Sequence, residues 1–109
     1  MNLLVLGINH KSAPVAIRER VAFVPETMEA ALTDAQLVEG VDELVILSTC
    51  NRTELYVWGE PLAHVLQRLL DWLADHHSLS REELASNSYH LEGESALRHL
   101  VEVAAGLDS

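Results

Sequence analysis

Two short apolar segments, close together in the chain, most constrain how this protein can fold. Leu44–Leu47 and Leu55–Trp58 have the length and the aliphatic or aromatic content of β-strands. Only a short polar segment, Ser48–Thr53, separates them, and Asn51 within it favours a turn. Because so short a connection joins antiparallel neighbours, we expect a hairpin with Cys50 at its tip.

Strand and helix patterns alternate on both sides of this hairpin. Leu3–Ile8 is a nearly continuous apolar run, typical of a strand buried on both faces, and Ser88–Leu91 fits a fourth strand. Capping signals and apolar spacing predict helices that begin near Ser12, run from Pro25 to Gly40, from Leu62 to His76, briefly after Ser80, and finally to Gly106. This order predicts an α+β fold, the ferredoxin-like split βαβ sandwich (βαββαβ), with extra helices and a C-terminal helix.

The topology predicts which segments share one end of the sheet. With right-handed connections, the first and second strands run one way and the third and fourth run back. His10–Ser12, the Thr49–Arg52 turn and the start of the fourth strand then lie at one end, toward which the last helix carries Ser109. His99 lies roughly opposite that helix's apolar stripe, which favours a solvated histidine; the stripe consists of Leu97, Leu100, Val101 and Ala104.

Length and charge limit the possible functions. The chain has 109 residues, room for one domain with a modest core, which excludes a complete two-domain enzyme. Its formal net charge of −10 opposes a broad grip on DNA or RNA, and the basic excess of Lys11, Arg18 and Arg20 is confined to the N-terminal segment. No apolar run suffices for a membrane span and no targeting signal is visible, so we expect a cytoplasmic protein.

The single cysteine, Cys50, is the strongest candidate for chemistry. A lone cysteine excludes an internal disulfide, and no Cys-x-x-Cys pair indicates a zinc or redox site. The polar neighbours Thr49, Asn51 and Arg52 favour an exposed, reactive thiol over a buried one, although each alone also fits a solvated turn. A functional Arg52 would bind a carboxylate, because a guanidinium offers paired donors to two oxygens.

The histidines do not form a metal-ligand pattern. They lack the HExxH or any other ligand spacing, so we expect no metal; besides His10 they are His64, His76, His77, His90 and His99. His10 follows the first strand and either supports the thiolate or bonds to the backbone. The residues alone leave open a non-enzymatic, ferredoxin-like module that binds a ligand or a regulatory partner.

Three stretches of the sequence resemble a known family. They are Gly7–Val15 with Arg18-Glu19, Ser48–Glu54, and His99-Leu100 with Val103–Ser109. The whole chain is similar to the N-terminal catalytic domain of bacterial-type glutamyl-tRNA reductases. This resemblance implies that glutamyl-tRNA is reduced with NADPH to glutamate-1-semialdehyde, the first step of the five-carbon route to tetrapyrroles and haem.

The resemblance also implies roles for individual residues. Cys50 is expected to attack the aminoacyl ester and form a glutamyl thioester, with His99 as the second catalytic residue. His10 is expected to play a supporting part. The expected substrate-binding residues are Thr49, Asn51, Arg52 and Ser109.

Full members of the family continue into an NADPH-binding domain and a helical dimerisation domain. Residues 1–109 are therefore expected to form the catalytic domain alone, which acylates Cys50 without making the aldehyde. The expected partners are glutamyl-tRNA(Glu), glutamate-1-semialdehyde aminomutase and, through the absent domain, a second copy of the chain. Neither DNA nor a membrane is an expected partner.

Overall fold

The computed structural model describes residues 1–107, in which four strands form a single antiparallel sheet. The strands are β1 (Leu3–Asn9), β2 (Val41–Ser48), β3 (Arg52–Gly59) and β4 (Tyr89–Glu92), in the spatial order β2-β3-β1-β4. All neighbouring pairs are antiparallel, so β1 and β2 run one way and β3 and β4 run back. The predicted ferredoxin-like α+β class is confirmed.

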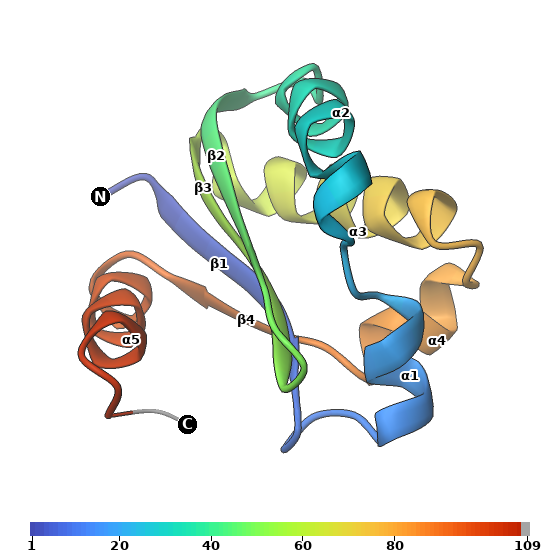
Figure 1. Ribbon diagram of the computed structural model, residues 1–109. Coiled ribbons are helices and arrows are strands. Elements are labelled where there is room, and N and C mark those ends of the chain that lie inside the picture. Colours follow the sequence, from blue (N-terminus) through green and yellow to red (C-terminus); the bar gives the residue numbers. More distant parts are fainter. Residues whose placement is uncertain (108–109) are drawn as a thin grey trace.

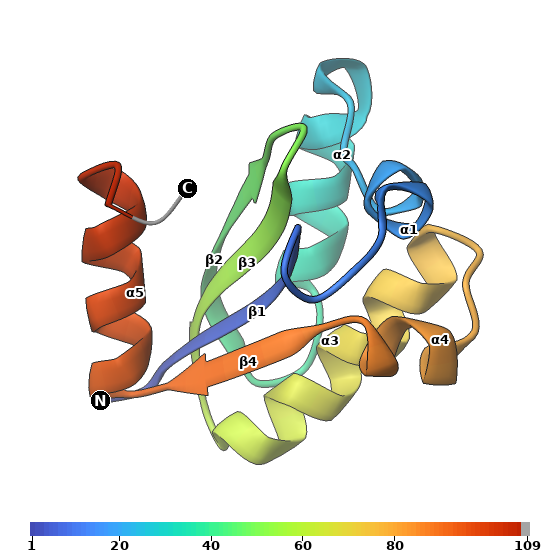
Figure 2. The same cartoon turned by 90° about the horizontal axis from the view of Figure 1, so that it is seen from below.

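Helices cover both faces of this sheet. They are α1 (Val15–Arg20), α2 (Pro25–Gln36), α3 (Leu62–His76), α4 (Arg81–Ser86) and α5 (Glu94–Ala104). Figure 2 shows α5 alone on one side of the sheet, which we call the outer face, and the other helices beyond the opposite, inner face. In Figure 1 the tip of the β2–β3 hairpin lies at the same end of the molecule as α1.

The inner face carries the main hydrocarbon core. Strands send alternate side chains to each face, and α3 meets the inner face with leucines at helical spacing. The largest buried contributors include Leu4, Leu6, Ile8, Leu55, Leu69, Leu73 and Leu84. Burial of this set against α2 and α3 gives the fold most of its apolar stabilisation.

The outer face has a smaller core beneath α5. Leu3, Val5, Tyr56 and Ala96 are buried there. Arg52 and Glu54 are buried as well, and they belong to the alternate β3 positions that include Tyr56. The outer face therefore combines a thin apolar layer with buried charge.

Two helix boundaries differ from the prediction. Ser12 does not cap α1, which begins at Val15, because the Ser12 hydroxyl accepts a hydrogen bond from the Asn9 amide at 3.0 Å. The second helix ends at Gln36, since the chain turns before Gly40, whose φ of +94° suits glycine. The predicted cap of α4 is confirmed, with the Glu83 amide donating to the Ser80 hydroxyl at 3.0 Å.

None of the helices in residues 1–107 has the length and apolarity to cross a bilayer.

Candidate functional site

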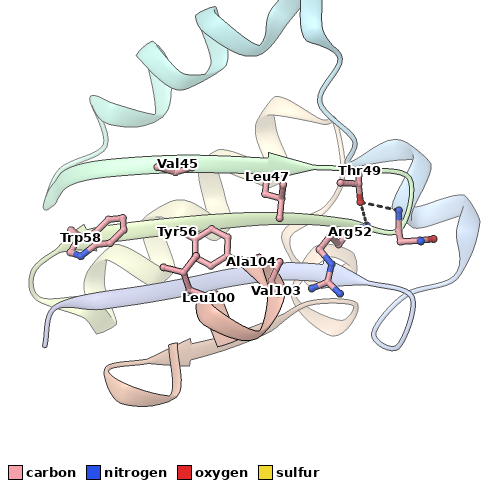
Figure 3. A pocket seen from close by; sticks show the side chains of 10 residues that line it. Val45, Leu47, Thr49, Arg52, Tyr56, Trp58, Leu100, Val103 and Ala104 are labelled. Atoms are coloured by element: carbon pink, nitrogen blue, oxygen red, sulfur yellow. Dashed lines mark hydrogen bonds between the residues drawn. The ribbon is translucent and has the colours of Figure 1, made fainter. Parts of the chain in front are cut away.

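The hairpin tip is a tight turn that Thr49 holds in shape. The Thr49 amide donates to the Arg52 carbonyl at 2.8 Å, which closes the turn around Cys50 and Asn51. The Thr49 hydroxyl accepts from the amides of Asn51 and Arg52 at 3.3 and 3.2 Å (Figure 3). A threonine at this position therefore fixes the backbone on both sides of the cysteine.

The base of the hairpin is anchored to the chain that precedes α2. The Ser48 hydroxyl accepts from the Phe23 amide at 2.9 Å and lies 3.3 Å from the Thr53 hydroxyl. Cys50 lies between the end of β2 and the start of β3, which confirms the predicted hairpin-tip position, and it is exposed, as expected. The thiol is thus presented to solvent on a hydrogen-bonded turn.

A pocket of about 540 Å³ opens between the outer face and α5; we call it the α5 pocket. Its walls are mostly apolar and include Val45, Leu47, Tyr56, Trp58, Leu100 and Val103. At the hairpin end they become polar, with Thr49 and Arg52 (Figure 3). Asn51 also lines this end. An apolar pocket with a few converging polar groups is the usual form of a small-molecule site.

A second hollow of about 400 Å³, the α1 pocket, lies between α1 and the hairpin tip. Cys50 lines this hollow, together with Arg18 and Glu19 of α1. Thr49 and Asn51 line both pockets, so the turn that carries the thiol separates them.

Glu54 forms a buried polar network on the outer face. It has no exposed surface, and its carboxylate accepts hydrogen bonds from Tyr56 Oη at 2.6 Å and from Tyr89 Oη. Arg52 Nη1 lies 3.3 Å and His99 Nε2 2.5 Å from Oε2 of the same carboxylate. The network links β3 to β4 and α5, and it holds the Arg52 guanidinium at the edge of the α5 pocket.

Gly7 makes this network sterically possible. In the sheet register Gly7 lies between Glu54 of β3 and Tyr89 of β4. A Cβ atom on Gly7 would lie 2.5 Å from Tyr89 Oη, closer than real Cβ contacts come. The missing side chain lets the Tyr89 ring lie across β1 and reach Glu54.

The network keeps Glu54 ionised. Burial raises the pKa of Glu54, but hydrogen bonds from Tyr56, Tyr89 and His99 together lower it by more than burial raises it. The pKa of Glu54 is therefore below its usual value. Burial and the bond to Glu54 raise the pKa of Tyr89, which stays a neutral donor. Since an ionised carboxylate only accepts, His99 Nε2 carries the proton in the His99–Glu54 bond.

The expectation of a solvated His99 is wrong. Its side chain is 11% exposed and points inward to Glu54, whereas Leu97 and Val101 of the predicted apolar stripe are 40% and 56% exposed. The helix is rotated from the predicted orientation because the small Ala96, which is fully buried, packs against the sheet. His99 therefore stabilises the Glu54 network rather than lining either pocket.

The other predicted residues fall into separate groups. Thr49, Asn51 and Arg52 meet at the α5 pocket, while His10 is exposed after β1 and forms no side-chain hydrogen bond within residues 1–107. Ser109 lies outside the described residues. Within residues 1–107, no three His, Cys, Asp or Glu side chains are grouped so as to hold a metal ion.

Comparison with known proteins connects this geometry to a family. The protein-family model described as the glutamyl-tRNA(Glu) reductase N-terminal domain matches residues 6–109 of the sequence. The chain belongs to that family. A glutamyl-tRNA reductase from Idiomarina loihiensis is 50% identical over all 109 residues.

Solved structures give the same result. The structure of glutamyl-tRNA reductase from Methanopyrus kandleri superposes with a TM-score of 0.70 at 30% identity, over 99% of this chain and 23% of that one. The chain spans only 25% of the length of the Idiomarina relative. It therefore aligns with one part of these longer relatives.

Sequence reasoning missed three residues of this site. Glu54, Tyr56 and Tyr89 were given no role, although Glu54 belongs to the stretch that carries the resemblance. One signal was available: Glu54 is two residues from both Arg52 and Tyr56, and in a strand such residues face the same side. An acidic residue flanked in that way indicates a buried pair.

Proposed function

We propose that this domain accepts the glutamyl group of glutamyl-tRNA as a thioester on Cys50. The single observation that carries the proposal is the exposed Cys50 on a turn between two pockets, one of which is lined by Arg52. Membership of the family supports the choice of substrate.

The proposed reaction is an acyl transfer. The Cys50 sulfur attacks the ester carbonyl carbon, a C–S bond forms, the C–O bond to the ribose breaks, and the ribose oxygen takes the proton that the thiol lost. The thioester carbonyl has less resonance stabilisation than the ester and accepts hydride more readily, so covalent catalysis divides one difficult step into two.

Arg52 is the proposed partner of the side-chain carboxylate of the glutamyl group. It lines the α5 pocket, and Glu54 holds its guanidinium in place at 3.3 Å. A guanidinium presents paired N–H donors that match the two oxygens of a carboxylate. Thr49 and Asn51 border the same pocket, and we propose that they bind the rest of the glutamyl group.

We propose that His99 contributes through Glu54. Its Nε2–H donates to that carboxylate, and without this bond Glu54 would lose a donor and Arg52 would lose part of its support. The resemblance gives His99 a catalytic part; the geometry favours one that keeps the substrate-binding arginine in position.

NADPH does not fit the described residues. They form an antiparallel sheet, whereas Rossmann-type dinucleotide sites lie at the carboxyl ends of parallel strands beside a glycine-rich turn. We derive no reduction step from this chain. Reduction by NADPH, the homodimer and the aminomutase partner are proposals for the longer enzyme.

The test is incubation of the chain with radiolabelled glutamyl-tRNA. We expect label on the protein that hydroxylamine releases, and none on the Cys50→Ser variant. Absence of label on the unmodified chain, or equal label on both, would leave a non-enzymatic binding module as the better account. A thiol that reacts with iodoacetamide no faster than a free peptide cysteine supports that alternative.

A further inference from the structure

The α1 pocket is not needed to bind the glutamyl group, yet it borders the proposed nucleophile. α1 contributes Arg18 and Glu19 to it, and the hairpin contributes Thr49, Cys50 and Asn51. At about 400 Å³ it lies within the usual size range of small-molecule sites. The pocket therefore has the volume for a second part of a substrate.

The two arginines of α1 are in different states. Arg20 donates to the Ser78 carbonyl at 3.1 Å and pairs with Glu83 at 3.6 Å. Arg18 lies in the wall of the α1 pocket, is only partly buried, and forms no side-chain hydrogen bond or ion pair within residues 1–107. Its guanidinium therefore has N–H donors that an acceptor in the pocket can use.

We propose that the α1 pocket binds the 3′-terminal nucleotide of the tRNA, with Arg18 on its phosphate and Glu19 on the free ribose hydroxyl. This inference rests on the proposed function, since it concerns the alcohol side of the ester that Cys50 attacks. That ester joins the glutamyl acyl group to an alcohol, which is the ribose of the terminal nucleotide. The turn that carries Cys50 has the α5 pocket on one side and the α1 pocket on the other.

The chemistry of both side chains matches a nucleotide. A guanidinium forms short, charge-assisted bonds with phosphate oxygens. A carboxylate accepts hydrogen bonds from ribose hydroxyls, as in dinucleotide sites. Because Glu19 repels a bare phosphate in the same pocket, we expect a nucleotide to bind better than inorganic phosphate.

This assignment also explains how so acidic a chain engages tRNA. The net charge is −10, but the basic excess lies in the segment that contains Arg18. Local contacts with one nucleotide need no broad positive surface.

The first test compares two acyl donors on the Arg18→Met variant. Glutamyl-tRNA carries the nucleotide, whereas the α-benzyl thioester of glutamate does not. We expect the second-order rate constant of Cys50 acylation to fall about tenfold with glutamyl-tRNA and to stay within about twofold with the benzyl thioester. Arg20→Met removes the same charge from the same helix and is expected to leave both rates unchanged.

Equal losses with both donors, or no loss with glutamyl-tRNA, overturn the inference. The second test is independent of acylation: adenosine 5′-monophosphate is titrated into the unmodified chain and followed by amide NMR shifts. We expect shifts in residues 15–22 and 49–51, weaker binding of inorganic phosphate, and about tenfold weaker nucleotide binding for Arg18→Met.

The two tests separate failure of the inference from failure of the proposed function. Acylation of Cys50 without nucleotide shifts in α1 overturns the inference alone. Nucleotide shifts in α1 without any acylation support the nucleotide site and overturn the thioester proposal.

Discussion

The two faces of the sheet are built from the same strands but bury different chemistry. In β3, Leu55 and Val57 pack into hydrocarbon on the inner face, whereas Arg52, Glu54 and Tyr56 on the outer face are buried in a polar network. α2 and α3 cover the inner face, while α5 leaves the α5 pocket open on the outer face. Alternate residues of one strand thus serve stability on one face and the candidate ligand site on the other.

Removing a large core side chain from each face gives the largest expected difference. Leu69 of α3 is fully buried on the inner face, and Leu69→Ala is expected to lower the free energy of unfolding by about 4 kcal/mol. Leu100 borders the α5 pocket and is only partly buried, so Leu100→Ala is expected to cost less than about 1.5 kcal/mol. Urea denaturation measures both; equal losses would contradict the assignment of stability to the inner face.

Replacing the buried carboxylate tests the outer face. Glu54→Gln keeps the shape but removes the charge that Arg52 and His99 bind, and it is expected to cost about 2–3 kcal/mol at neutral pH. Glu43→Gln, at an exposed position in β2, is the control and is expected to stay within about 0.5 kcal/mol.

The same pair of variants makes a pH prediction. Because the pKa of Glu54 is lower in the folded chain than its usual 4.5, its contribution is complete above pH 4.5 and is lost as the pH falls through the folded value. Acid denaturation is therefore expected to be less steep for Glu54→Gln than for Glu43→Gln. Identical acid profiles would contradict an ionised Glu54.

Arg52→Lys tests whether the guanidinium geometry matters. Lysine keeps the charge but loses the paired donors, so we expect about tenfold slower acylation of Cys50 by glutamyl-tRNA. Arg68→Lys is the matched control, because Arg68 pairs with Glu39 at the surface and lies outside the α5 pocket. An Arg52→Lys rate equal to that of the control would remove Arg52 from the substrate site.

The smallest expected effect concerns an aromatic cluster at the edge of the inner face. His77 packs edge-on against Phe23 with ring centroids 4.7 Å apart, and burial together with the charge of His76 lowers its pKa to about 4. Between pH 6.5 and 4 the unfolded chain therefore binds a proton that the folded chain does not. The free energy of unfolding consequently decreases as the pH is lowered through this range. Because His77 is partly exposed, we expect a slope below about 1 kcal/mol per pH unit.

His77→Gln is expected to flatten that slope. His64 is an exposed histidine of α3, the helix that ends just before His77, and His64→Gln is expected to keep the slope. Thermal or urea unfolding at several pH values distinguishes the two variants, and equal slopes would show that His77 is solvated.

Much of the fold was predictable because local patterns determine it. The hairpin, the leucine spacing of α3 and the apolar run of β1 led to the observed fold class and strand directions. The position of Cys50 followed from the same hairpin, because the segment between the two predicted strands is so short that its middle residues must form the turn. These predictions needed no knowledge of distant contacts.

The Glu54 network was not predictable in that way. It depends on the register that places Gly7 between Glu54 and Tyr89, and the apolar pattern within each strand does not reveal which residues pair across strands. The rotation of α5 failed for a related reason: large aliphatic residues defined the expected stripe, while the small Ala96 makes the close contact with the sheet. His99 was consequently placed on the wrong side of its helix.

The most direct test of the account is peptide mapping of the chain after brief exposure to glutamyl-tRNA. The account predicts one added glutamyl group on the peptide that contains Cys50, and its loss after hydroxylamine treatment. A glutamyl group on any other residue, or an unmodified Cys50 peptide, would contradict the claim that this turn presents the nucleophile.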